Sequence, residues 1–133
     1  MLRLIAPAAL LAFSAIAPQA IAQNYPTKAV RIIAPFAPGG GTDFIARVAA
    51  NKLTETLGHT VIVDNRPGAG GTLGANVVAQ AEPDGYTLLF AATGPNAIAP
   101  GLQKNLPYDP VKGFAGISRI SIQPAIIVLN AEL

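Results

Sequence analysis

The sequence predicts an α/β fold in which strands and helices alternate in the order βαβαβ. Three apolar, partly β-branched runs supply the strands, at Val30–Ile33, Thr60–Val63 and Tyr86–Ala91. Two segments with helical spacing of apolar residues separate them, Phe44–Leu57 and Thr72–Ala81. Because strand-helix-strand connections are right-handed and leave the two strands parallel, these segments build one parallel sheet with helices on its faces.

Each predicted helix has an apolar stripe and a recognisable boundary. Gly58 ends the first helix, since glycine readily adopts the left-handed conformation found just beyond helix ends. The second helix begins after a glycine-rich turn and ends before the β-turn signal Glu82–Gly85. The apolar positions that define the stripes are Ile45, Val48, Ala49 and Leu53 in the first helix, and Leu73, Val77 and Ala81 in the second.

The turn Phe36–Asp43 joins the first strand to the first helix and carries three consecutive glycines. Such a turn exposes unpaired backbone N–H groups at the positive end of a helix dipole, which favours an anion. It is not a nucleotide P-loop, because Gly41 is followed by Thr42 and Asp43 and no lysine is supplied for a phosphate. By itself the turn fits two interpretations, an anion site and a tight connection that binds nothing.

The second glycine-rich turn, Asp64–Gly74, does not fit a dinucleotide site. The G-x-G-x-x-G pattern fails, because Gly68 and Gly70 are followed by Leu73 where the third glycine belongs. The acidic residue that would hold a ribose about 20 positions further on is also missing. We interpret the small residues here as close backbone packing at the start of the second helix.

Ligands of parallel sheets bind outside the carboxyl ends of the strands, where two loops of this chain meet. One is Phe36–Asp43 after the first strand, and the other is Ala92–Asn96 after the third. In the second loop Thr93 and Asn96 bring hydrogen-bonding side chains, and Gly94 lets a ligand approach the backbone. The same residue types are common in ordinary turns, so that interpretation stays open for this loop.

The first 22 residues have the pattern of a secretory signal peptide. Arg3 gives a basic start, an apolar stretch follows, and Ala20-Ile21-Ala22 matches an A-x-A cleavage site, so the mature chain is expected to begin at Gln23. The chain has 133 residues and no cysteine, so its fold is independent of disulfides. Together these features indicate export to a bacterial periplasm.

Charge and residue types exclude several classes of function. The formal net charge of +2 includes Arg3 of the expected leader, and the other basic residues are scattered without interleaved aromatics, which argues against nucleic-acid binding. His59 is the single histidine, so the sequence does not favour a histidine-based catalytic triad and excludes a metal site with several histidine ligands. Its position just after a helix end suits an exposed polar residue. We expect no cofactor and no metal.

The C-terminal part predicts two further strands, Gly116–Ile120 and Ala125–Leu129, after the proline-punctuated stretch Leu102–Phe114. The sequence stops shortly after the second of these, with only two convincing helices to cover a parallel sheet. We therefore expect a truncated chain.

Four motifs follow one another as they do in the tripartite tricarboxylate transporter substrate-binding proteins, the TctC or Bug family, which this chain resembles over nearly the whole expected mature length. The motifs are Phe36–Asp43, Asn65–Gly71, Pro83–Leu89 and Leu106–Phe114.

The resemblance implies a periplasmic binding protein of type II with two α/β lobes, which captures a small carboxylate and delivers it to membrane subunits of a tripartite tricarboxylate transporter. Residues 23–133 would form the first lobe and the start of the crossover to a second lobe that is largely missing. Family members hold the ligand carboxylate through backbone amides and ordered water. The positions that would line the cleft are Phe36, Pro38, Gly39, Gly40, Gly41, Thr42, Asp43, Thr93, Gly94 and Asn96.

Two residues near this site are open to more than one interpretation, and two other classes of protein compete. Asp43 either contacts ligand or caps the helix, and Arg66 either pairs with a second carboxylate or lies solvated in its turn. A small exported hydrolase lacks a G-x-S-x-G elbow, and Ser118 and Ser121 have no histidine near in the predicted fold. An interaction module would recruit a partner through the bare sheet. The favoured prediction is a binding protein rather than an enzyme, of undetermined carboxylate specificity.

Overall fold

A computed structural model describes residues 24–122 and 128–131 of the chain. The strands are β1 (Val30–Ala34), β2 (Val61–Asn65) and β3 (Thr87–Leu89). The longer helices are α2 (Gly41–Leu57) and α3 (Thr72–Ala79), and α3 follows a short 3-10 turn, η2 (Ala69–Gly71). After β3 come a π-helical turn, η3 (Gly94–Ile98), and α4 (Ala99–Leu102). The expected leader, residues 1–22, lies outside the described residues.

The strands form a parallel three-stranded sheet in the order β2-β1-β3, with β1 in the centre. Val30 pairs with Val61 at one end, and Ile32 lies between Val63 and Leu88. The predicted βαβαβ order and parallel sheet are confirmed. The loops after all three strands consequently lie at the same edge.

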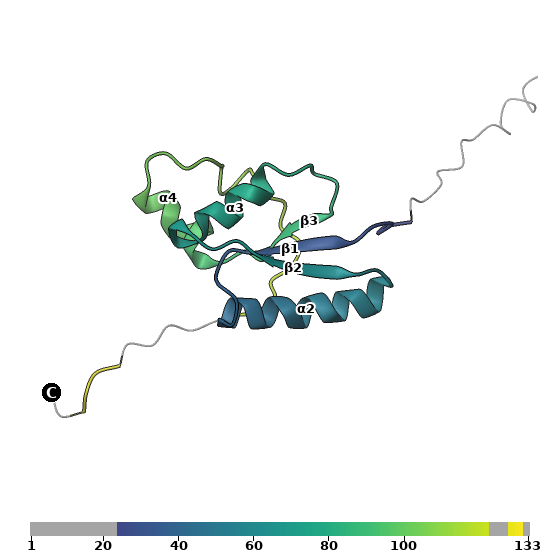
Figure 1. The fold of residues 1–133 in the computed structure, drawn as a ribbon. Coiled ribbons are helices and arrows are strands. Elements are labelled where there is room, and N and C mark those ends of the chain that lie inside the picture. The colour runs from purple at the N-terminus through teal and green to yellow at the C-terminus, as the bar shows by residue number, and fades with distance from the viewer. Residues whose placement is uncertain (1–23, 123–127, 132–133) are drawn as a thin grey trace, which may run out of the picture.

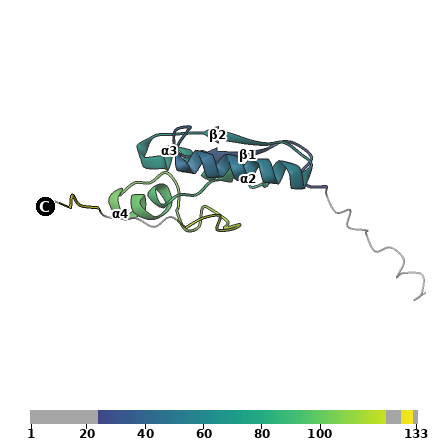
Figure 2. The same ribbon diagram turned by 90° about the horizontal axis from the view of Figure 1, so that it is seen from below.

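The two helices cover opposite faces of the sheet (Figure 1). On the α2 side, Val30 and Ile32 of β1 pack with Val61 of β2 and Ala50 of the helix to form the buried core. Figure 2, viewed from below, shows α2 lying along the strands. Ile33, on the other face of β1, is completely buried. The central strand β1 therefore has a helix on each of its faces.

The faces that the helices bury match the predicted stripes only in part, since Leu53 of α2 packs against the core but several other predicted positions are exposed. In α2 the buried residues are Asp43, Ala46 and Ala50, while Val48 is 53% exposed. In α3, Leu73 is 55% exposed and the buried residues are smaller, namely Thr72, Gly74 and Ala75. Small side chains allow the helix backbone to approach the sheet closely, so the size of the side chains as well as their hydrophobicity determines which helix face packs against the sheet.

Gly74 shows how close that approach is. A β-carbon added there would lie 2.9 Å from the Cα of Pro35 and 2.9 Å from the carbonyl oxygen of Arg66. Both contacts involve backbone atoms, which cannot move aside easily. The expectation of close backbone packing at the start of the second helix is confirmed.

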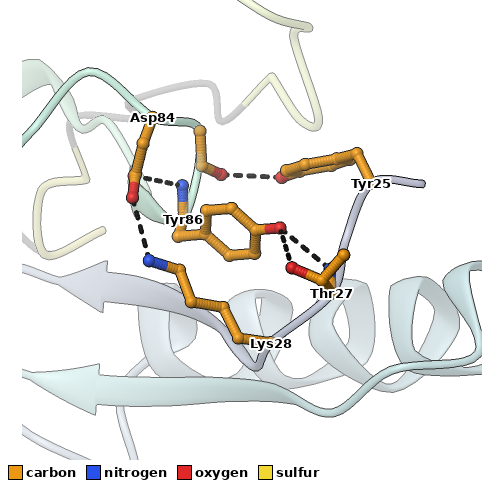
Figure 3. Close-up of polar contacts among 6 residues, drawn as sticks. Tyr25, Thr27, Lys28, Asp84 and Tyr86 are labelled. Atoms are coloured by element: carbon orange, nitrogen blue, oxygen red, sulfur yellow. Dashed lines mark hydrogen bonds and ion pairs between the residues drawn. The ribbon is translucent and has the colours of Figure 1, made fainter. Parts of the chain in front are cut away.

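At the amino end of the sheet, the segment before β1 is fastened to the turn before β3 (Figure 3). The Tyr86 hydroxyl hydrogen-bonds with the Thr27 hydroxyl at 3.2 Å and accepts from the Thr27 backbone N–H at 2.8 Å, and these two contacts lower the pKa of Tyr86. Lys28 pairs with Asp84 at 3.0 Å and its Nζ lies 4.3 Å from the centre of the Tyr86 ring. The Tyr25 and Tyr86 rings lie 5.1 Å apart. These contacts anchor the two strands at the end away from the glycine-rich loops.

The predicted strand Gly116–Ile120 is wrong, because residues 114–122 have no regular secondary structure. Ile117 and Ile120 are 80% and 57% exposed. A strand requires a neighbouring strand to satisfy its backbone groups, and β-branched composition alone does not supply one. Most of the predicted strand Ala125–Leu129 lies outside the described residues. Within the described part of the chain, no helix has the length and apolar character needed to cross a membrane.

Candidate functional site

Three loops converge at the carboxyl edge of the sheet. A β-carbon added to Gly94 would lie 2.8 Å from the Gly70 carbonyl oxygen and 3.8 Å from Cζ of Phe36. One added to Gly71 would lie 3.1 Å from Cδ of Pro95 and 3.4 Å from Cζ of Phe36. The structure thus brings together Phe36 and Gly94, from the two loops that the sequence predicted to meet. The turn after β2 joins them.

The loop after β1 ends in an open helix N-terminus. Gly40 is the N-cap residue of α2 and has no side chain to bond the first-turn amides. Helical bonding starts at Phe44, whose N–H donates to the Gly40 carbonyl at 2.9 Å, so the amides of Gly41, Thr42 and Asp43 precede it. Of the predicted site residues in this loop, Pro38, Gly39, Gly40 and Gly41 are exposed and Thr42 is half-buried. Accessible amides at the positive end of a 17-residue helix suit an anion.

Asp43 is the buried member of this loop, with 4% of its surface exposed. One carboxylate oxygen accepts from the backbone N–H of Gly39 at 2.9 Å and from Nε of Arg47 at 3.0 Å. The other accepts from Nδ2 of Asn65 at 2.9 Å and pairs with Nη2 of Arg47 at 3.0 Å. The hydrogen bond from Arg47, followed by those from Gly39 and Asn65, lowers the pKa of Asp43 to about 2. These contacts make Asp43 a supporting partner of the loop and of Arg47, while the N-cap of α2 itself is Gly40 and has no side-chain cap bond.

Arg66, directly after β2, is also paired within the chain. Its Nε donates to both carboxylate oxygens of Asp64, at 3.0 and 3.1 Å, and Nη2 lies 3.0 Å from the same group. Arg31 lies 3.7 Å from Asp64 on the neighbouring strand. This arrangement favours the interpretation of Arg66 as a turn arginine, with its side chain 53% exposed.

The loop after β3 continues into the π-helical turn η3. Thr93 is exposed, Gly94 is half-buried, and the Asn96 side-chain oxygen is buried with no hydrogen-bond partner in the part of the chain that the structure describes. A helix containing a π turn of this kind often marks a functional site. Of the three residues, Gly94 is the one whose contacts place it beside Phe36.

Proline chemistry explains the π turn. The Ala99 N–H donates to Gly94, five residues earlier, and the next residue, Pro100, has no N–H to offer Pro95. The Tyr108 hydroxyl donates to the Pro95 carbonyl instead, at 2.7 Å, and Tyr108 is 8% exposed. Burial raises the pKa of Tyr108. The Tyr108 side chain therefore holds the turn that carries Gly94 and Asn96.

The other hollows and polar residues of the described chain do not suggest a different binding site. An open hollow of about 630 Å³ lies beside α4, lined by residues including Gln103, Lys104 and Asp109, and none of the predicted site residues lines it. His59 is exposed, as expected, with Nδ1 3.3 Å from the Leu57 carbonyl. Over residues 24–122 and 128–131, no three carboxylate or histidine side chains gather in a way that would hold a metal ion.

The sequence analysis missed the supporting roles of Arg47, Asn65 and Tyr108. The spacing of Asp43 and Arg47 is a signal for the first, because residues four apart face each other on a helix. Asn65 is the last residue of β2, so the parallel register places it at the same edge as the loop after β1. Tyr108 lies far along the chain in an irregular stretch, where no periodic pattern indicates its partner.

Comparison with known proteins places these features in a family. The family model described as "Tripartite tricarboxylate transporter family receptor" matches residues 45–133. Protein BugT of Bordetella pertussis is 38% identical over 124 residues, which cover 92% of this chain and 38% of BugT. The chain therefore spans well under half the length of this relative.

Two solved structures share the fold. The periplasmic binding protein BugD has a TM-score of 0.61 and 44% identity, with 68% of this chain and 30% of BugD covered. MatC from Rhodopseudomonas palustris, solved with bound malate, has a TM-score of 0.65 and 42% identity, with 68% of this chain and 31% of MatC covered. Fold, motifs and sequence identity agree: this chain belongs to the TctC family of tripartite tricarboxylate transporter receptors, which are periplasmic binding proteins.

Proposed function

We propose that this chain forms one wall of a carboxylate-binding site in a periplasmic solute-binding protein that serves a tripartite tricarboxylate-type transporter. The observation that carries the proposal is the open N-terminus of α2 at the carboxyl edge of the sheet, capped by a glycine and preceded by a loop whose Phe36 lies near Gly94. The malate bound to MatC, a relative of the same fold, supports a small carboxylate as the ligand class.

The chemistry of the loop suits a carboxylate better than a phosphate or a neutral solute. The amides of Gly41 and Thr42 supply donors at the positive end of a helix dipole, a site of modest charge that matches a single carboxylate. Asp43 does not oppose the ligand charge, because Arg47 neutralises it at 3.0 Å. In this proposal Phe36, Pro38, Gly39, Gly40, Thr93, Gly94 and Asn96 complete the wall.

Residues 23–133 form the first lobe in this proposal, and residues 1–22 are a leader removed on export. A ligand held by one wall keeps much of its surface in water, so we expect weak affinity, with a dissociation constant on the order of 1 mM, about −4 kcal/mol. Binding rather than catalysis fits the placement of His59, which follows the carboxyl end of α2 at the end of the sheet away from the loops.

A carboxylate titration tests the proposal. The full chain is titrated with malate, succinate, citrate and acetate by isothermal calorimetry, and the melting temperature is followed in parallel, because a ligand of the folded state raises it. We expect binding of at least one di- or tricarboxylate. A folded chain that binds none of them at concentrations well above 1 mM contradicts the proposal.

The affinity of a Gly40→Val variant tests whether the ligand binds at the loop after β1. Gly40 has φ −82° and an added β-carbon would meet nothing closer than 3.8 Å, so the fold should tolerate valine while the branched side chain covers the neighbouring amides. Gly116→Val is the matched control, since Gly116 has open space around it and lies outside the loop. Equal affinity in both variants would remove the loop from the site.

A further inference from the structure

A closed hydrogen-bond network lies behind the candidate binding loop. It joins Asp43 and Arg47 of α2 to Asn65 at the end of β2, and reaches the loop itself at Phe36 and Gly39. The carboxylate of Asp43 receives four donated contacts between 2.9 and 3.0 Å, which occupy both of its oxygens. It has no accepting capacity left for a ligand.

Asn65 is the member that joins strand, helix and loop. Its Nδ2 donates to the Phe36 carbonyl at 3.1 Å and to Asp43 at 2.9 Å, and its Oδ1 accepts from Nη2 of Arg47 at 3.1 Å. The reversed amide would set its oxygen against two acceptors, so the side chain has one stable orientation. The half-buried Asn65 side chain therefore fixes the distance between the end of β2 and the Phe36 carbonyl.

We propose that Asn65 is the positioning residue of the binding loop: by bonding the Phe36 carbonyl and Asp43 together, it holds residues 36–40 in the conformation that presents the α2 amides to a ligand. This inference rests on the proposed function for its effect on affinity. Its effect on the loop is independent of any ligand.

The two bonds that Asn65 makes lie on either side of the exposed turn. Phe36 begins the loop, and Asp43 reaches back to the N–H of Gly39 near its middle. Between these points, Ala37 to Gly40 are exposed, with few neighbours to restrain them. Loss of Asn65 leaves the Asp43 to Gly39 bond as the remaining side-chain contact described for this loop. The loop then samples conformations in which the amides no longer converge, and ordering it again on binding costs affinity.

Amide hydrogen exchange of the full chain, measured by NMR, tests the effect on the loop. In Asn65→Ala we expect the Gly39 amide to exchange about tenfold faster than in the wild type, the effect of losing one net hydrogen bond. Thr54→Val is the matched control, because the Thr54 hydroxyl accepts from the Val61 N–H at 2.9 Å and joins α2 to β2 at the other end of the sheet. It should lower stability without changing exchange at Gly39.

Malate titration of the same three proteins tests the effect on binding. We expect Asn65→Ala to raise the dissociation constant about tenfold and Thr54→Val to leave it unchanged. If the wild type does not bind malate while Gly39 exchange still rises, the positioning role stands and the proposed function fails. Wild-type exchange at Gly39 in folded Asn65→Ala overturns the inference. Asn65→Ser, which is too short to reach both partners, replaces the alanine variant if that variant does not fold.

Discussion

Tyr108→Phe removes the hydroxyl that donates to the Pro95 carbonyl while leaving the ring in place. The bond is 2.7 Å long and buried, and Pro100 cannot replace it, because proline has no backbone N–H. The variant therefore leaves a buried carbonyl without a partner, which costs about 1–3 kcal/mol of folding free energy. We take about 2 kcal/mol as the expected loss, since the ring still packs edge-on against Phe114 at 5.6 Å.

Urea denaturation followed by circular dichroism measures this loss, and a thermal scan should show a melting temperature lower by roughly 8–16 °C for a domain of this size. Tyr25→Phe is the control, because the Tyr25 hydroxyl donates to the Gly85 carbonyl at the same 2.7 Å but in an exposed position. Water can replace that bond, so the control should lose about 0.5 kcal/mol or less. Equal losses in the two variants would refute the explanation of the π turn by the Tyr108 bond.

Three further predictions concern the loop and the export of the chain. The pKa of Asp43 is lowered to about 2, so the ionised carboxylate contributes fully to stability at pH values above its ordinary pKa of about 4, and this contribution is lost as the pH falls towards 2. Asp43→Asn should therefore make the free energy of unfolding less dependent on pH between about 4 and about 2. The same pH dependence in the variant and the wild type would contradict this. Gly39→Ala should lose about 1 kcal/mol in urea denaturation because Gly39 has φ +85°, whereas Gly40→Ala, at φ −82°, should not, and equal stability of the two would exclude strain at Gly39. N-terminal sequencing of the protein recovered from a bacterial periplasm should begin at Gln23, and a sequence beginning at Met1 would exclude the leader.

The sequence predicted those parts of the fold that depend on local signals. Gly58 ends α2 in the left-handed conformation, at φ 68°, as its position after the apolar repeat indicated. The parallel order follows from alternating segments and the handedness of crossovers, so the meeting of Phe36 and Gly94 was predictable as well.

The parts that the sequence did not predict depend on contacts between distant residues. The packed helix faces were predicted only in part: Leu53 packs against the core as expected, but Ala46 and Ala50 are buried in close contact while the larger Val48 is exposed. The role of Asn65 depends on where the end of β2 meets the loop after β1, and the Tyr108 bond depends on a missing amide at Pro100. Neither of these relations produces a periodic pattern in the sequence from which it could be predicted.

The central position of β1 has a consequence for the order in which the sheet assembles. Both other strands pair with β1, and β2 follows it within residues 30–65, whereas β3 is separated from it by more than fifty residues. Closing the shorter loop costs less chain entropy, so we expect the β1-α2-β2 unit to form first during folding and β3 to dock on its free edge afterwards. In a chain that emerges from a membrane amino end first, that unit is complete before β3 has crossed. Pulse-labelled hydrogen exchange during refolding should then protect the amides of Ile62 and Asp64, which pair with β1, before that of Leu88, and simultaneous protection would show that the three strands assemble in one step.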